Sequence, residues 1–171
     1  MAAVRSQVRA GLVAMVAAVP QPARSVVVYT DGACIRNPGP GGWAWAVSED
    51  RYASGCEVAT TNQRMELRAV IEALAAFPSG EVKVISDSTY VVNCFRQRWW
   101  AGWRARGWRN SKGEPVANQD LWRPLVALVI DERPGSIQLE WVKGHGTNLG
   151  NILADRLATE AARLQRPAVA G

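Results

Sequence analysis

Four acidic residues stand where the sequence predicts ordered elements: Asp31, Glu66, Asp87 and Asp155. Asp31 follows the apolar run 26–29, and Asp87 follows the run 81–86. A single acid at a strand end is usually a cap or a turn former, but open sheets bind ligands where the carboxyl ends of adjacent strands meet. Converging carboxylates repel one another unless protons or cations neutralise them. If these four converge, their hard oxygen donors predict a site for Mg²⁺ or Mn²⁺ rather than Zn²⁺.

His145 is the only histidine in the chain and lies between Gly144 and Gly146. The flanking glycines predict a mobile loop, because glycine leaves the backbone free. The residues alone leave two interpretations open. The imidazole is either an ordinary exposed side chain or a group that transfers protons near neutral pH.

A third group of residues combines positive charge with aromatic rings. Between Arg96 and Lys112 there are six basic residues and no acid. Four tryptophans interleave with them: Trp99, Trp100, Trp103 and Trp108. One interpretation is a solvated basic helix whose indoles pack inward. The other is a handle for nucleic acid, in which arginines hold phosphates and some indoles lie along sugars or bases.

The elements that would position these residues alternate between strands and helices. Apolar and β-branched runs predict strands over 26–29, 43–47, 52–56, 81–86 and 137–142. The turn formers Asn-Pro-Gly-Pro-Gly-Gly at 37–42 separate the first two strands. We therefore expect the first three strands to form an antiparallel meander.

Helices are expected between and after the strands. The first helix is capped near Thr61 and ends before Pro78, and the second starts at Ser88. A third helix is expected over 118–130, with a kink at Pro124, and a last one over 148–164. The order βββαβααβα predicts an α/β fold. Its core is expected to be a mixed five-stranded sheet with helices on both faces.

The 171 residues suit one domain, which we expect over 25–165, followed by a short tail over 166–171. Residues 1–24 differ in composition, with three arginines, no acid and a short apolar stretch. They are either a targeting segment or a disordered extension. We favour the extension, because Pro20 follows the apolar stretch without a small-residue cleavage site.

Charge and cysteine content narrow the class of protein. A net charge of +5 favours a polyanionic partner, although charge bears on association and not on fold. The three cysteines show no CxxC spacing, which argues against a disulfide scaffold or a zinc site and for a reducing compartment. No apolar run approaches the roughly 18 residues of a membrane span.

Five motifs are similar, in the same order, to motifs of the type 1 ribonucleases H. They are Tyr-Thr-Asp-Gly-Ala-Cys (29–34), Asn-Pro-Gly-Pro-Gly-Gly (37–42), Thr-Thr-Asn-Gln-Arg-Met-Glu-Leu (60–67), Ser-Asp-Ser-Thr-Tyr-Val (86–91) and Trp-Val-Lys-Gly-His (141–145). One short motif would carry little weight, but five in order at compatible spacing are specific. The chain resembles this family over about 25–163, and the ribonuclease H-like fold is expected.

The resemblance implies an endonuclease that hydrolyses the RNA strand of RNA–DNA hybrids, leaving 5′-phosphate and 3′-hydroxyl ends. It implies that Asp31, Glu66, Asp87 and Asp155 are catalytic ligands of two Mg²⁺ ions, with Mn²⁺ as a substitute. His145 would assist proton transfer and product release. We expect a cytoplasmic monomer that makes no membrane contact.

Substrate contacts also follow from the resemblance. Short polar groups would recognise the RNA strand through its 2′-hydroxyls: Cys34, through its backbone, Asn37, Asn62, Gln63 and Thr89. The stretch 103–108 resembles the basic protrusion that grips the DNA strand in some bacterial members. The corresponding residues are Trp99, Trp103, Arg104, Arg106 and Trp108, and Asn151 is a further expected contact near Asp155. The loop that follows His145 departs from the family's common pattern at 148–150. This departure bears on the mobility of that loop and on the rate of cleavage.

Two other functions are compatible with the same fold. A transposase or integrase core would be expected to lack the basic protrusion and the Trp-Val-Lys-Gly-His motif. A catalytically dead module that binds hybrids or RNA would be expected to have lost at least one of the four acids, and all four are present.

Overall fold

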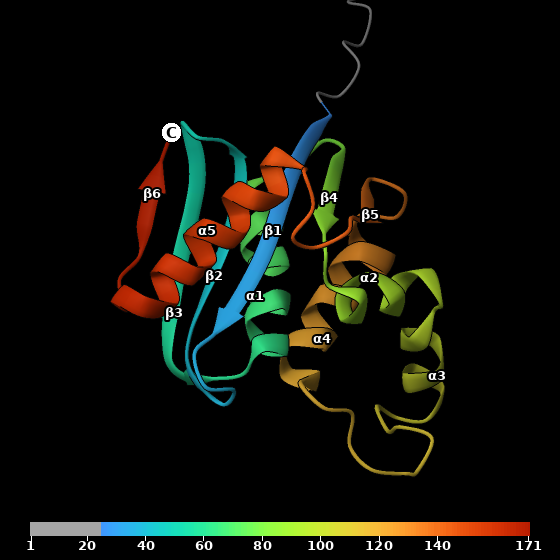
Figure 1. Cartoon of the computed structure of the whole chain (residues 1–171). Helices are drawn as coiled ribbons and strands as arrows, with labels where there is room; N and C mark the ends of the chain where they lie inside the picture. Colours follow the sequence, from blue (N-terminus) through green and yellow to red (C-terminus); the bar gives the residue numbers. More distant parts are fainter. Residues whose placement is uncertain (1–24) are drawn as a thin grey trace, which may run out of the picture.

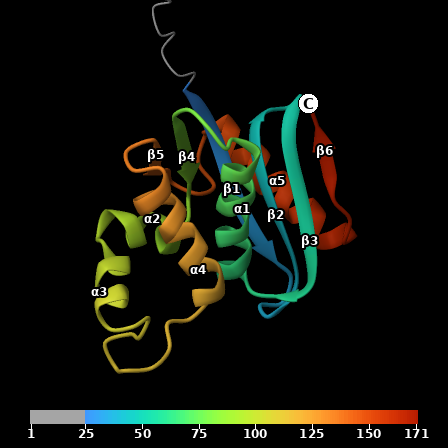
Figure 2. The ribbon, with the colours of Figure 1, turned by 180° about the vertical axis from the view of Figure 1, so that it is seen from behind.

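A mixed six-stranded sheet runs through the centre of the molecule in the order β5-β4-β1-β2-β3-β6 (Figure 1). The computed structural model describes residues 25–171, so the expected extension over 1–24 lies outside the described residues. Helix α5 covers one face of the sheet, and α1 and α4 cover the other, as the view from behind shows (Figure 2). The α/β class and the placement of helices on both faces are confirmed.

Five strands lie where the sequence predicted them. β1 (Val26–Cys34), β2 (Gly39–Ser48) and β3 (Arg51–Thr60) form the antiparallel meander. β4 (Val82–Ser86) and β5 (Ile137–Trp141) add in parallel on the other side of β1. Strand β1 is therefore central, with an antiparallel neighbour on one side and a parallel neighbour on the other.

The sixth strand corrects the expected count of five. β6 (Ala168–Ala170) pairs antiparallel with β3, with Tyr52 opposite Ala170. The expected C-terminal tail over 166–171 thus includes a strand. Three residues are too few to display a period of two, and the pairing depends on an edge of the sheet that is distant in sequence.

Three helices begin at polar caps: α1 (Asn62–Ala76) at Thr61, α2 (Thr89–Arg96) at Ser88 and α5 (Leu149–Leu164) at Asn148. Each cap's side-chain oxygen accepts a bond from a backbone N–H of the first turn at 3.1 to 3.3 Å. Such caps satisfy N–H groups that have no partner within the helix. They fix where α1, α2 and α5 begin, and with them the positions of three acids of the candidate site.

The remaining helices are α3 (Trp99–Ala105), α4 (Gln119–Val126) and η1 (Ala127–Glu132), a π-helical segment. The single helix expected over 118–130 is therefore α4 continued by η1. Pro124 lies inside α4 and has no N–H to donate, so one intrahelical bond is missing there. The expected irregularity takes the form of wider π turns that follow Val126.

The two faces of the sheet are packed with side chains of different size. Large residues such as Leu67 and Trp122 fill the core on the α1 and α4 face. On the α5 face the core is smaller, with Ala44 and Ala46 of β2 against α5. Gly42 permits the close approach, because a Cβ there would collide with the backbone of Ala158. No helix among residues 25–171 combines the length and the apolar character needed to cross a membrane.

Candidate active site

A polar hollow of about 280 Å³ opens where β1 and β4 approach their carboxyl ends. These strands are parallel neighbours, so Asp31 on β1 and Asp87 just beyond β4 reach the same edge of the sheet. Glu66 enters the hollow from α1, and Asp155 enters it from α5. The fold thus brings the four acids singled out in the sequence together from four separate elements.

Asp31 is buried, with 7% of its surface exposed. Burial raises its pKa from 3.8 to about 8, and the negative charges of Asp87, Asp155 and Glu66 add to the rise. The N–H of Gly32 donates to Oδ1 of Asp31 at 2.8 Å and offsets part of this effect. The hollow therefore holds more negative charge than the surrounding protein compensates.

Burial likewise raises the pKa of Glu66 to about 7, with a contribution from the charge of Asp87. Each of its oxygens has a donor: Asn62 Nδ2 donates to Oε1 at 2.9 Å, and the Ser88 hydroxyl donates to Oε2. The same hydroxyl accepts the capping bond at the start of α2. Ser88 therefore orients Glu66, a role that sequence reasoning missed because its one local signal was that of a helix cap.

Three residues between the end of β5 and the first turn of α5 contact Asp87. Asn151 Nδ2 donates to its Oδ2 at 3.3 Å, and the indole N–H of Trp141 donates to its main-chain oxygen at 3.0 Å. Gly144 lies against the carboxyl group, since a Cβ there would be 2.7 Å from Oδ2. Trp141 lies within a predicted motif, but its contact with Asp87 joins residues 54 positions apart and leaves no local signal.

Two predicted site residues flank these carboxylates in different ways. His145 is exposed, lines the hollow and adopts a left-handed backbone with φ of 53°. Asn151 was expected to contact the substrate, but it is only 3% exposed, and its Oδ1 has no hydrogen-bond partner among the described residues. The structure places Asn151 beside Asp87, behind the surface of the hollow.

The donor set of the hollow fits a hard divalent cation. All four acids offer oxygen, and the raised pKa values of Asp31 and Glu66 indicate a place where positive charge would be stabilised. Within residues 25–171, no three His, Cys, Asp or Glu side chains form a compact ligand group. An open arrangement of this kind suits Mg²⁺, which usually keeps several of its waters and binds through one or two carboxylates.

Two of the five residues expected to recognise RNA line the same hollow. Cys34 and Asn62 line it, and the backbone N–H of Asn62 donates to Asn37 Oδ1 at 3.2 Å, joining the β1–β2 turn to α1. Gln63 and Thr89 are exposed in the first turns of α1 and α2. The five residues therefore occupy the end of β1, the β1–β2 turn and the starts of α1 and α2.

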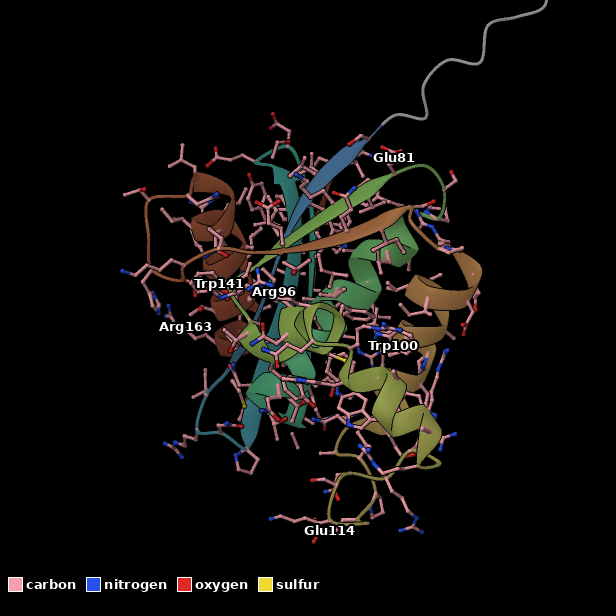
Figure 3. The ribbon with its side chains drawn as sticks, turned by 90° about the vertical axis from the view of Figure 1, so that its right-hand side faces the viewer. Glu81, Arg96, Trp100, Glu114, Trp141 and Arg163 are labelled. Atoms are coloured by element: carbon pink, nitrogen blue, oxygen red, sulfur yellow. The ribbon has the colours of Figure 1, made fainter. Side chains whose placement is uncertain are left out.

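The indoles of the expected handle pack largely against one another. Trp103 contacts Trp122 of the core with ring centroids 5.4 Å apart, and Trp108 and Trp99 lie 6.0 and 6.4 Å from Trp103. The side chains of Trp99, Trp103 and Trp108 are half-buried. The tryptophans anchor α3 and the following loop to the core, and Figure 3 shows this protrusion with Trp100 on α3 and Glu114 at its far end.

The arginines of the protrusion have partners within the protein. Both terminal nitrogens of Arg104 donate to the Asp131 carboxylate, at 3.0 and 2.5 Å. Arg106 Nε donates to the main-chain oxygen of Arg109 at 3.2 Å. Arg104 was expected to hold phosphate, so a phosphate there would have to replace Asp131 or share the guanidinium with it.

A second hollow, of about 470 Å³, lies where α5 begins and is lined mostly by apolar groups such as Tyr29, Leu149 and Ile152. Its two charged residues, Glu49 and Arg156, pair with each other at 3.6 Å. This hollow lacks the uncompensated acids that distinguish the first, so the carboxylate hollow is the candidate active site.

The sequence matches the family model described as RNase H over residues 23–163. It is 46% identical over 143 residues to the ribonuclease H of Syntrophomonas wolfei, covering 81% of this chain and 96% of that protein. The family model thus spans β1 to β5 and all of α5 but its last residue, with all four carboxylates of the hollow, and leaves out β6.

The chain is also similar to solved structures of ribonucleases H. The structure of LC9-RNase H1, a type 1 RNase H with the type 2 active-site motif, superposes with a TM-score of 0.72 at 31% identity, covering 90% of this chain and 81% of that one. A foamy viral protease-reverse transcriptase in complex with an RNA/DNA hybrid matches with a TM-score of 0.66 at 26% identity, over 94% of this chain and 22% of that one.

Proposed function

The chain belongs to the type 1 ribonuclease H family, and we propose that it hydrolyses the RNA strand of RNA–DNA hybrids at the carboxylate hollow. The relatives are ribonucleases H that match over nearly their whole length, and one similar structure contains a bound hybrid. The observation that carries the assignment of the site is the convergence of four acids from four elements, two of them with strongly raised pKa values.

We propose that Asp31, Glu66, Asp87 and Asp155 hold two divalent cations, Mg²⁺ in the cell and Mn²⁺ as a substitute. When bound, these ions supply positive charge to the attacking and leaving oxygens of an in-line displacement at phosphorus. The oxygen of water adds to phosphorus, and the bond from phosphorus to the 3′ oxygen breaks. The products carry a 5′-phosphate and a 3′-hydroxyl.

His145 is proposed to move the protons of this reaction. It is the only histidine of the chain, it is exposed and it lines the hollow, where its imidazole could pass a proton to or from the reacting oxygens. Its left-handed backbone between two glycines supports a loop that changes conformation as product leaves.

Recognition is proposed to use two surfaces. Asn37, Asn62, Gln63, Thr89 and the backbone near Cys34 would contact the 2′-hydroxyls of RNA, which distinguish it from DNA. The protrusion, with Arg104, Arg106 and its partly exposed tryptophans, would follow the DNA strand. Asn151 would act on the substrate only indirectly, by donating to Asp87.

The organisation of the protein is proposed to be simple. Residues 25–165 would form the catalytic domain, with 1–24 as an extension and 166–171 as an appended edge strand. We propose a monomer that works in the cytoplasm and makes no membrane contact, in keeping with the reducing compartment inferred from its cysteines.

Cleavage of a labelled RNA–DNA hybrid with and without Mg²⁺ tests the proposal. Wild type should cut only the hybrid, and only with the cation, whereas Asp87→Asn should not cut. Asp50→Asn, at the exposed β2–β3 turn, is the matched control and should behave as wild type. Double-stranded DNA, double-stranded RNA and single-stranded RNA should stay intact. A folded wild type that binds hybrid but leaves it intact with Mg²⁺ and Mn²⁺ would instead be a binding module.

A further inference from the structure

Trp141 makes one side-chain contact that the activity does not explain. It is the last residue of β5, and its indole N–H donates to the main-chain oxygen of Asp87 at 3.0 Å (Figure 3 labels Trp141). The backbone pairing of β4 and β5 ends at the same place, with Ser86 opposite Trp141 and a bond from Val142 N to Ser86 O at 3.0 Å. The indole therefore extends the link between the two strands by one residue, to Asp87.

The oxygen that accepts this bond belongs to the peptide that joins Asp87 to Ser88. Asp87 projects its carboxyl group into the hollow, and Ser88 donates its hydroxyl to Glu66 and caps α2. A rotation of this peptide would move the Asp87 side chain and the Ser88 hydroxyl together. The hydrogen bond from Trp141 thus affects the positions of two carboxylates, that of Asp87 directly and that of Glu66 through Ser88.

The N–H of the same peptide, on Ser88, donates to Ser86 Oγ at 3.1 Å, so Trp141 holds the oxygen of the peptide and Ser86 holds its N–H. The other contacts of Asp87 act on its side chain. Gly144 backs the carboxyl group, and Asn151 donates to Oδ2 at 3.3 Å. Neither of these contacts restrains the main chain at Asp87. Restraint of the Asp87 side chain comes from Gly144 and from Asn151 in α5, whereas its main-chain oxygen is held by Trp141 at the end of β5.

Trp141 is more exposed than a core tryptophan, so its hydrogen bond can be considered apart from its packing. Trp141 is 40% exposed, whereas Trp122 in the main core is 0% exposed. A tryptophan with this exposure contributes less to the core than a fully buried one, so its hydrogen bond is the more specific part of its role.

We propose that Trp141 is a positioning residue, whose indole N–H holds the Asp87–Ser88 peptide so that Asp87 and Glu66 present their oxygens to a divalent cation. The inference rests on the proposed function of the hollow. Partners that orient metal ligands typically change metal affinity by about 10- to 100-fold when they are removed.

Trp141→Phe tests the proposal, because it removes the N–H and keeps an aromatic ring. Titration of Mg²⁺ or Mn²⁺ into substrate-free protein, followed by calorimetry, should show a dissociation constant raised by about tenfold. At subsaturating cation, kcat should fall with KM for the hybrid unchanged, and higher Mg²⁺ should restore most of the loss. Glu140→Gln, at the preceding exposed position of β5, is the matched control and should bind the cation as wild type does.

A measurement on wild type keeps the test independent of how well the variant folds. Hydrogen exchange at the Trp141 indole N–H should be slowed, although the residue is 40% exposed. A rapidly exchanging indole, or a folded Trp141→Phe protein with cation affinity within about twofold of wild type, would overturn the positioning role. Failure of wild type itself to bind cation and cut the hybrid would instead overturn the proposed function.

Discussion

The carboxylate hollow and the basic protrusion differ in the sign of their charged side chains and in how these side chains are paired. In the hollow, acids from four elements are drawn together, and burial and repulsion raise the pKa of Asp31 to about 8. On the protrusion, arginines lie at the surface and bind neighbouring acceptors, as Arg104 does with Asp131. Within residues 25–171, no Lys or Arg forms an ion pair with the four acids of the hollow, whereas Arg104 of the protrusion is paired with Asp131.

The difference separates a site that must be fixed from a surface that can adjust. An uncompensated buried charge is costly, so the surrounding donors must hold each carboxylate in place. A surface ion pair stabilises a protein by only about 0–1 kcal/mol and rearranges readily. If the protrusion binds the hybrid as proposed, Arg104 would exchange Asp131 for phosphate, while the contact of Trp103 with Trp122 keeps the base of the protrusion attached to the core.

The largest expected effect tests whether acids in the two regions differ in kind. Asp31→Asn should lower kcat on the hybrid by about 1,000-fold, because it removes a central charge of the hollow. Asp131→Asn removes the acid of η1 that pairs with Arg104 of the protrusion, and it should leave kcat within about threefold of wild type. Single-turnover cleavage with saturating Mg²⁺ measures both, and equal losses in the two variants would erase the distinction.

His145 tests whether an exposed residue can belong functionally to the hollow. His145→Ala should lower kcat by about 100-fold, the scale of a lost proton-transfer group, with little change in KM. His145→Gln, which keeps a polar side chain but cannot take up a proton, should lose as much. A variant with normal kcat would assign His145 to the loop alone.

The stability of the cation-free protein tests whether the charge of the hollow is truly uncompensated. The pKa of Asp31 is about 8 in the folded protein, above its ordinary 3.8, so between these values the folded state keeps a proton that the unfolded state loses. Its contribution to stability is complete below the ordinary pKa and is lost as the pH rises through about 8.

Asp31→Asn removes this dependence. In chelator-treated protein above pH 8, the variant should be more stable than wild type by at least about 1.4 kcal/mol, the value of one pKa unit. The difference should shrink as the pH falls to about 4. Urea unfolding at several pH values measures it. A variant that is less stable than wild type at high pH would mean that Asp31 is compensated after all.

The smallest expected effect concerns the grip of the protrusion. Asp131→Asn frees Arg104 and removes one negative charge near a polyanion, so hybrid affinity should rise by about twofold at low salt. The gain should disappear at high salt, where surface charges are screened. Binding of a non-cleavable hybrid at two ionic strengths measures it, with Glu132→Gln beside it as a control. A weaker affinity would show that Asp131 orders Arg104 for the substrate.

The sequence predicted the parts of the fold that depend on local patterns. Alternating and helical apolar periods located five strands and the main helices, and the caps at Thr61 and Ser88 located helix starts. It also singled out the four acids that the hollow brings together, because acids next to apolar runs are unusual. What each acid does there stays a prediction until the variants are measured.

The features that sequence reasoning missed are contacts between distant residues. The indole of Trp141 meets an oxygen 54 positions away, and Arg104 meets an acid 27 positions away. Both are ordinary side chains in their local surroundings, and only the assembled fold gives them partners. The pairing of β6 with β3 escaped prediction for the same reason.

The C-terminal strand has a consequence for how the protein behaves in concentrated solution. β6 covers the edge of β3 with three residues, while the opposite edge, β5, carries the exposed residues Gln138 and Glu140. Uncovered edges invite strands from other molecules, and a charged side chain discourages such pairing. Removal of residues 167–171 would leave the β3 edge open, and the shortened protein should aggregate at concentrations where the full chain stays dispersed.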